Sequence, residues 1–329
     1  MINMSGELHL VVGYSCNNRC IHCFMEDTRI ELGAAGKPLD KPTDEVKKEM
    51  QNPEIGTVLF TGGEPTIRGD FLELLRVAKN LGLSVSLQTN GRTFCVEGFA
   101  KKVMDIAPEM SFTIPLHSDK PKTHDEITRV GGSWKETTDG IKNLKKYGAR
   151  NICAKTVIQR SNYKDLDKIV ELASGLGAKK ISLTFPQIGG NRFAKWHEIV
   201  PRLREIEDYV KGAIKKANEL GTEITADAIP FCVLEGYEEY CGDLNTVLLP
   251  SIEGRFYKRK TNQEEDIIKD LEIGRRTKAD KCIGCKYFYV CIGVWRGYIG
   301  LYGTGEFKHV AGNMINDVGD FLKELGRIK

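Results

Sequence analysis

Three cysteines stand close together near the start of the chain: Cys16, Cys20 and Cys23, with the spacing C-x3-C-x2-C. They follow a short apolar run that is typical of a strand, so we expect them on one tight loop. Three thiolates on such a loop can hold three irons of a [4Fe–4S] cluster and leave the fourth iron open to a small molecule. Zinc is the alternative, but His22 directly precedes Cys23 and is poorly placed to bind the same ion.

A second motif, Gly62-Gly63-Glu64-Pro65, follows the apolar stretch Thr57–Phe60, which we expect to be a buried strand. Two glycines at a strand end let a ligand approach the backbone closely. The backbone groups exposed there can bind an amino acid, and Glu64 can accept a hydrogen bond from an ammonium group. The alternative is an ordinary Gly-Gly turn.

Strand and helix patterns alternate along the first two thirds of the chain, which indicates an α/β fold with a parallel sheet. The predicted strands are Glu7–Tyr14, Thr57–Phe60, Ser84–Gln88, Met110–Leu116, Ile152–Ile158 and Lys180–Phe185. The predicted helices are Thr43–Gln51, Phe71–Leu81, Val96–Ile106, Trp134–Tyr147, Tyr163–Leu176 and Val200–Leu220. A further strand is conceivable at Thr222–Asp227. We expect the charged stretch Lys258–Lys281 to be a solvated helix or linker.

Parallel α/β folds bind ligands at the carboxyl ends of their strands, and the polar segments follow this rule. The cysteine loop and the Gly62–Pro65 segment follow the first two strands. Thr89-Asn90-Gly91 follows the third, and His117-Ser118-Asp119 follows the fourth. Lys155 lies within the fifth strand, where an inward-pointing ammonium group would need a partner or a ligand.

Five further cysteines lie towards the end of the chain. Cys282, Cys285 and Cys291 have the spacing C-x2-C-x5-C, and Cys232 and Cys241 precede them. Four of these five thiols can close a second metal site. Both an iron–sulfur cluster and a zinc knuckle use a C-x2-C pair.

The composition excludes several classes of protein. The chain has 329 residues, 41% of them hydrophobic, and a net charge of +3, so no global signal points to nucleic acid or to a membrane surface. No apolar run is long enough to span a bilayer, and residues 1–6 are too short and polar for a signal peptide. We therefore expect a cytoplasmic protein whose ten cysteines serve metal sites rather than disulfides.

The cysteine triplet and the GGEP segment together resemble the radical S-adenosylmethionine (SAM) superfamily. The C-terminal cysteines resemble its SPASM or twitch extension, which houses auxiliary clusters. In the full SPASM pattern another cysteine stands where this chain has Trp295, so one auxiliary [4Fe–4S] cluster is expected. The resemblance implies a partial (β/α)6 TIM-like barrel over residues 1–220 and a small cysteine-rich extension over residues 221–329.

The resemblance also assigns roles to residues. The triplet would hold the reactive cluster, and SAM would bind the open iron through its amino and carboxylate groups. Gly62, Gly63, Glu64 and Pro65 would contact the amino group of SAM, Thr89 and Asn90 its ribose or carboxylate, and Arg129 its carboxylate. Cys232, Cys282, Cys285 and Cys291 would hold the auxiliary cluster, with Cys241 in reserve. No single catalytic side chain is implied.

The implied activity is reductive cleavage of SAM to a 5′-deoxyadenosyl radical that takes hydrogen from a substrate. A flavodoxin- or ferredoxin-like protein would supply the electron. Many relatives with this extension modify peptides, so peptide or protein modification is the first expectation. The alternatives are a small-molecule oxidoreductase acting on a sugar, nucleoside or cofactor precursor, a glycyl-radical activase, and a non-catalytic iron–sulfur or zinc scaffold.

Overall fold

The computed structural model describes residues 6–188, 195–244 and 275–326. Its centre is one sheet of seven parallel strands in chain order, from β1 to β7. The strands are β1 (Gly6–Val11), β2 (Ile55–Thr61), β3 (Ser84–Gln88), β4 (Ser111–Pro115), β5 (Asn151–Val157), β6 (Lys180–Thr184) and β7 (Glu223–Asp227). The parallel α/β fold is confirmed, and the sheet is an open partial barrel.

The sheet has one strand more than the six we expected. Strand β7 pairs in parallel with β6, from Lys180 opposite Glu223 to Thr184 opposite Asp227. It begins shortly after residue 220, where we predicted the barrel domain to end, and it still belongs to the barrel sheet. The division into two domains itself stays a prediction.

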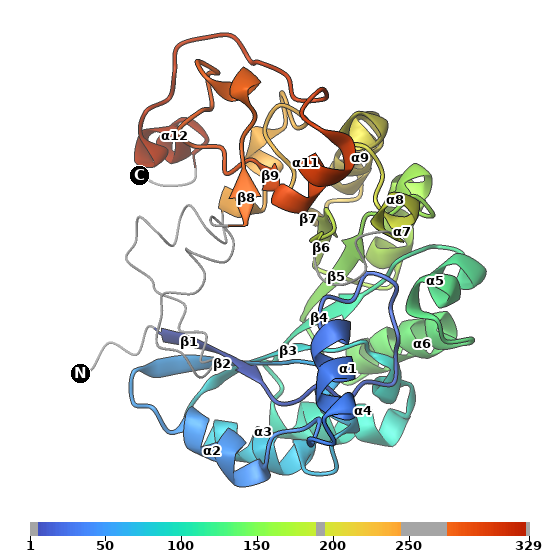
Figure 1. The fold of residues 1–329 in the computed structure, drawn as a ribbon. Helices are drawn as coiled ribbons and strands as arrows, with labels where there is room; N and C mark the ends of the chain where they lie inside the picture. The colour runs from blue at the N-terminus through green and yellow to red at the C-terminus, as the bar shows by residue number, and fades with distance from the viewer. Residues whose placement is uncertain (1–5, 189–194, 245–274, 327–329) are drawn as a thin grey trace.

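Helices connect the strands and cover the outer face of the curved sheet (Figure 1). Helix α3 illustrates why: Phe71, Leu74, Leu75 and Ala78 recur at helical spacing and are buried, so this apolar stripe packs on the sheet. The α-helices are α1 (Glu26–Ala34), α2 (Thr43–Met50), α3 (Phe71–Asn80), α4 (Glu97–Ile106), α5 (Pro121–Thr128), α6 (Ser133–Lys146), α7 (Leu166–Gly175), α8 (Trp196–Ile199), α9 (Leu203–Glu219), α11 (Arg296–Tyr302) and α12 (Val318–Glu324). Short 3-10 turns occur at η1 (Pro65–Ile67), η2 (Arg92–Cys95), η3 (Tyr163–Asp165), η5 (Glu238–Tyr240) and η8 (Asp280–Cys282).

The inner face of the sheet is more polar than the outer one. Along β5, Ile152, Ala154 and Thr156 are buried under the helices, whereas Cys153 and Lys155 alternate with them and are only half-buried. Successive strand residues point to opposite faces, so Cys153 and Lys155 belong to the inner face.

The C-terminal part packs against the second half of the barrel. A short antiparallel pair, β8 (Arg276–Thr277) and β9 (Val294–Trp295), precedes α11 and α12. One continuous apolar cluster runs from Leu116 in the barrel to Leu322 in α12, so this part has no separate core. The charged stretch Lys258–Lys281 lies mostly outside the described residues.

In the part of the chain that the structure describes, no helix is long and apolar enough to cross a membrane.

Candidate functional site

The cysteine loop follows β1 and is held by two backbone hydrogen bonds to the end of α5. The peptide nitrogen of Arg19 donates to the carbonyl of Thr128 over 3.0 Å, and that of Ile21 donates to Ile127 over 2.9 Å. The loop therefore lies at the carboxyl edge of the sheet, as predicted, and α5 fixes its course.

The three thiols of this loop suit a buried iron–sulfur cluster. Burial, together with the neighbouring thiols, raises the pKa of Cys20 to about 12, and burial raises the pKa of Cys16 to about 11. The peptide nitrogen of Asn18 donates to Sγ of Cys16 over 3.3 Å, which favours the thiolate form once a metal binds. Three neighbouring thiols with such a donor fit three irons of a cubane cluster, because thiolates are the ligands that iron–sulfur clusters use.

The two glycines of the GGEP segment allow the second loop to pack directly against the first. A Cβ atom at Gly62 would lie 2.3 Å from the carbonyl oxygen of Gly13, and one at Gly63 would lie 2.1 Å from that of Ser15. Gly63 also donates its peptide N–H to Gly13 over 2.9 Å. The two glycines therefore serve, before any ligand binds, to let the loop after β2 pack closely on the loop after β1.

Glu64 is buried and links the loop after β2 to the loop after β3. Its Oε1 accepts hydrogen bonds from the hydroxyls of Thr66 and Thr89, over 2.6 and 2.7 Å, and its Oε2 accepts from the peptide nitrogen of Asn90 over 2.6 Å. Burial raises the pKa of Glu64, and these hydrogen bonds oppose that rise. The carboxylate thus shapes the site, and its contact with SAM stays a prediction.

Asn90 and Arg92 connect the third loop to the cysteine loop. The Asn90 amide donates to Oδ1 of Asn17 over 2.5 Å, and the Arg92 guanidinium donates to the carbonyl of Asn17 over 2.6 Å and to Asn18 Oδ1 over 2.9 Å. Arg92 also pairs with Glu136 of α6. Sequence reasoning missed Arg92, and its position directly after the Asn90-Gly91 turn was the available signal.

Arg129 lies at the end of α5, one residue beyond Thr128, and its side chain is exposed. Its backbone has a φ of 56°, in the left-handed region that non-glycine residues rarely adopt. A strained backbone conformation persists only where the surrounding structure holds it, and such positions cluster at functional sites. Arg129 thus lies beside the cysteine loop, and its contact with SAM stays a prediction.

Asp125 holds the turn that follows Arg129. Its carboxylate accepts hydrogen bonds from the peptide nitrogens of Gly132 and Trp134, over 2.7 and 2.8 Å, and from the Ser133 hydroxyl over 2.8 Å. Burial opposes ionisation, but these hydrogen bonds outweigh it and lower the pKa of Asp125. The turn is thereby fixed next to the cysteine loop.

Lys155 on β5 and Asp227 on β7 place opposite charges on the inner face of the two strands that flank β6. Lys155 lies opposite Ser182 in the β5–β6 register, and the Ser182 hydroxyl donates to Asp227 on β7. The Thr184 hydroxyl also donates to Asp227, over 3.2 Å. Within the described residues, the Lys155 ammonium has no hydrogen bond or ion pair, so it is available to an anionic ligand.

Four of the C-terminal cysteines line a single cavity. Cys232, Cys282, Cys285 and Cys291 come from two distant segments and meet there. Burial, and to a smaller extent the other three thiols, raise the pKa of Cys232 to about 11. Lys278 and Lys308 also line the cavity, together with four aromatic side chains: Phe231, Tyr287, Phe288 and Phe307.

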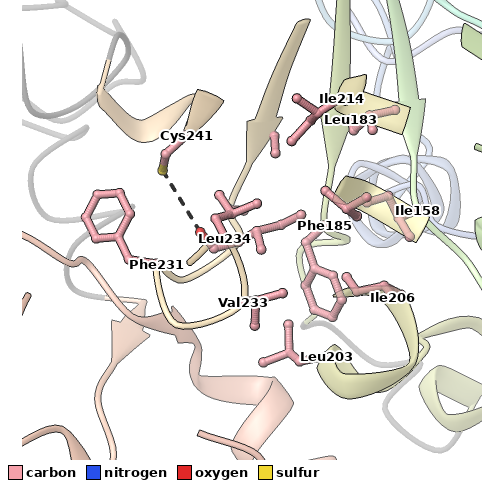
Figure 2. Close-up of a cluster of buried hydrophobic side chains, with 14 of the residues drawn as sticks. Ile158, Leu183, Phe185, Leu203, Ile206, Ile214, Phe231, Val233, Leu234 and Cys241 are labelled. Atoms are coloured by element: carbon pink, nitrogen blue, oxygen red, sulfur yellow. Dashed lines mark hydrogen bonds between the residues drawn. The ribbon is translucent and has the colours of Figure 1, made fainter. Parts of the chain in front are cut away.

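Cys241, which we held in reserve as a ligand, lies in apolar surroundings next to this cavity but not in its wall. It is 2% exposed, and Sγ points to the carbonyl of Ile229 at 4.0 Å. Figure 2 shows it near Phe231 and Leu234, with the dashed line marking this contact. Cys95 and Cys153 are free and half-buried.

Comparison with known proteins agrees with this arrangement. Residues 10–173 match the family model described as "Radical SAM superfamily". The chain is 29% identical over 280 residues to a probable GTP 3′,8-cyclase of Saccharolobus islandicus, a match that covers 81% of this chain and 86% of that protein. It is 32% identical over 167 residues to an AdoMet-dependent heme synthase of Oleidesulfovibrio alaskensis, covering 50% of this chain and 41% of the other.

Two solved structures share the fold over almost the whole chain. The enzyme anSMEcpe with bound AdoMet matches with a TM-score of 0.61 at 15% identity, over 97% of this chain and 95% of that one. Streptococcus suis SuiB, bound to its precursor peptide SuiA, matches with a TM-score of 0.60 at 16% identity, over 93% of this chain and 75% of the other.

The fold and the cysteine loop define a radical enzyme of the partial-barrel type. The chain belongs to the radical SAM superfamily, and its cofactors are SAM and a [4Fe–4S] cluster.

Proposed function

We propose that Cys16, Cys20 and Cys23 hold the SAM-binding [4Fe–4S] cluster and that a second [4Fe–4S] cluster occupies the C-terminal cavity. When bound, the first cluster and SAM supply the 5′-deoxyadenosyl radical that takes a hydrogen atom from the substrate. The single observation that carries the proposal is the convergence of four cysteines from distant segments on one aromatic-walled cavity. This arrangement supports a twitch-like extension with one auxiliary cluster.

The chain's own residues would position SAM. Backbone groups of Gly62 and Gly63, fixed against the cysteine loop, would bind the amino end of its methionine part. Thr89 and Asn90 lie on the adjoining loop and would contact the ribose or the carboxylate. Arg129 would meet the carboxylate, because its exposed cation lies directly beyond the residues that bind the cysteine loop. A flavodoxin- or ferredoxin-like donor would reduce the cluster.

We propose that the substrate is a small polar molecule with an anionic group. The Lys155 ammonium, which is unpaired among the described residues, would bind this group on the inner face of β5. The Asp227 carboxylate would accept a hydrogen bond from a hydroxyl or amine of the same molecule. The sequence relatives support this class of substrate, since one of them is named for a reaction of GTP.

The experiment that tests this proposal uses the anaerobically reconstituted full chain with SAM, dithionite and GTP as the probe. Stimulated formation of 5′-deoxyadenosine together with a modified nucleotide supports it. The Lys155→Met variant should then raise the Michaelis constant for GTP without changing SAM cleavage in the absence of GTP. A Michaelis constant that does not change would remove Lys155 from substrate binding.

Peptide modification, our first expectation from the sequence, is the second candidate. The observation that favours it is the fold, which SuiB and anSMEcpe share over 93% and 97% of this chain. At such low identity, this similarity supports the architecture more than the substrate. A short precursor peptide encoded next to this chain, and modified by it in the presence of SAM, would favour this candidate.

A further inference from the structure

An unusual feature of the site is His117, a buried histidine whose ring has no partner. It follows β4, is 1% exposed, and both of its ring nitrogens lack a hydrogen-bond partner among the described residues. Leaving a buried polar group unpaired destabilises the folded state, so native proteins rarely do it without a functional reason.

The backbone of His117 is fixed on both sides. Its peptide nitrogen donates to Nδ1 of His124 over 3.2 Å, and its carbonyl accepts from the Asn162 amide over 2.9 Å. Its ring contacts that of His124 on one side, with centroids 5.5 Å apart, and that of His22 on the other, at 4.8 Å. The ring is therefore held in one place by its surroundings, although its nitrogens are free.

The free nitrogens lie beside a cluster ligand. Sγ of Cys20 and the nearest ring nitrogens of His22 and His117 all lie within 4.8 Å of one another. The other neighbour, His22, is anchored by Gln159, whose amide nitrogen lies 2.8 Å from Nδ1. His117 thus lies next to the Cys20 corner of the proposed metal site.

The chemistry of the two partners matches. An imidazole ring carries at least one N–H donor, whether it is neutral or protonated. The sulfurs of an iron–sulfur cluster are electron-rich acceptors, and hydrogen bonds to them make the cluster easier to reduce.

We propose that His117 donates its ring N–H to sulfur at the Cys20 corner of the SAM-binding cluster and thereby raises the reduction potential of that cluster. His117 is a positioning residue in this role, because it acts on the cluster and not on the substrate. The inference rests on the proposed ligand role of Cys20, and it explains why a residue far from the cysteine loop in the sequence keeps an unpaired imidazole there.

The test compares the variants His117→Phe and His117→Asn in the full chain with reconstituted clusters. Phenylalanine keeps the ring packing but removes the donor, whereas asparagine keeps an N–H. The midpoint potential of the SAM-binding cluster is measured without SAM, by redox titration followed by electron paramagnetic resonance. The signal of this cluster is identified as the one that the Cys20→Ala variant lacks.

His117→Phe should shift the midpoint potential to a more negative value, and His117→Asn should restore part of the shift. The matched control is His197→Phe, because His197 also makes an edge-on ring contact, with Tyr302, but lies elsewhere in the fold. It should leave the potential unchanged. His117→Phe should also raise the thermal midpoint of the cluster-free chain, since an unpaired buried polar group is removed.

An unchanged potential in a fully loaded His117→Phe protein would overturn the inference. If that variant instead weakens SAM binding alone, His117 serves SAM and not the cluster, which also overturns it. Failure of the underlying ligand assignment is a separate result: the Cys20→Ala variant would then keep every iron–sulfur signal.

Discussion

The Glu64 carboxylate accepts a hydrogen bond from the peptide nitrogen of Asn90 over 2.6 Å, and it thereby links the loops after two neighbouring strands. Three further hydrogen bonds, from Thr66 and Thr89, occupy the other carboxylate oxygen. A motif that predicts a SAM contact is therefore also a structural link between loops. These hydrogen bonds of one buried acceptor help to hold both loops in place.

We expect Glu64→Ala to lower the free energy of unfolding of the cluster-free chain by about 2–4 kcal/mol, because it leaves several buried donors unpaired. Denaturant unfolding under anaerobic conditions measures this change. Glu126→Ala is the matched control, since Glu126 is exposed and, among the described residues, pairs only with Lys122, at 4.0 Å. A loss for Glu64→Ala no larger than that of the control would mean that Glu64 does not organise the loops.

The Asp125 turn gives a prediction on pH. Because its hydrogen bonds lower the pKa of Asp125 in the folded state, the stability that they contribute is present above the pKa of the unfolded chain, about 4, and is lost as the pH falls through the folded value. Asp125→Ala should therefore lower stability by about 2 kcal/mol at pH 7 and by less near pH 3. A difference between the two proteins that is constant with pH would contradict this account.

Arg92 should control how firmly the cysteine loop holds its cluster. The Arg92→Met variant removes the hydrogen bonds to Asn17 and Asn18, so we expect faster loss of iron to a chelator and little change in overall stability. The absorbance of the cluster over time provides the measurement. Arg76→Met is the control, because in the described part of the chain Arg76 makes only an exposed hydrogen bond within its own helix, to Leu72. Equal rates of iron loss in both variants would exclude the role of Arg92.

Cys232 and Cys241 provide a direct test of the auxiliary site. Only Cys232 lines the cavity, whereas the thiol of Cys241 points to the carbonyl of Ile229. Cys232→Ala should therefore lower the iron content of the reconstituted chain, and Cys241→Ala should leave it unchanged. Iron loss in the second variant alone would make Cys241 the fourth ligand.

We expect the two cluster sites to have different functions, so that losing the auxiliary cluster does not prevent SAM cleavage. Cys285→Ala should spare the reductive cleavage of SAM, but lower the iron content and block product formation. The measurement is 5′-deoxyadenosine and iron per chain. An unchanged iron content in this variant would remove the auxiliary cluster from the account.

Much of this architecture follows from sequence patterns, and the exceptions have physical reasons. Strands such as Ser84–Gln88 are bounded as predicted, because their apolar alternation ends at polar turns. Helix α1 was missed, since none of its residues is buried and its pattern carries no amphipathic stripe. Strand β7 was predicted only as a further strand outside the barrel. Its pairing with β6 could not be predicted, because the long helix α9 separates the two strands in the sequence.

In the site, too, local features were predicted and contacts between distant segments were not. The three cysteines at 16, 20 and 23 are close in sequence, so their spacing predicts a common site. The contacts of His117 with His22, and of Arg92 with Asn17, join loops from different strands. Such contacts depend on the order of strands in the sheet, which no local pattern contains.

The most direct test of the central claim is anaerobic reconstitution with iron and sulfide, followed by an iron count and a dithionite assay for 5′-deoxyadenosine from SAM. We expect about eight irons per chain, if both sites hold [4Fe–4S] clusters, together with formation of 5′-deoxyadenosine. About four irons with activity would leave the C-terminal cysteines to zinc or to structure. No cleavage of SAM by the fully loaded, reduced protein, with or without substrate, would contradict the account.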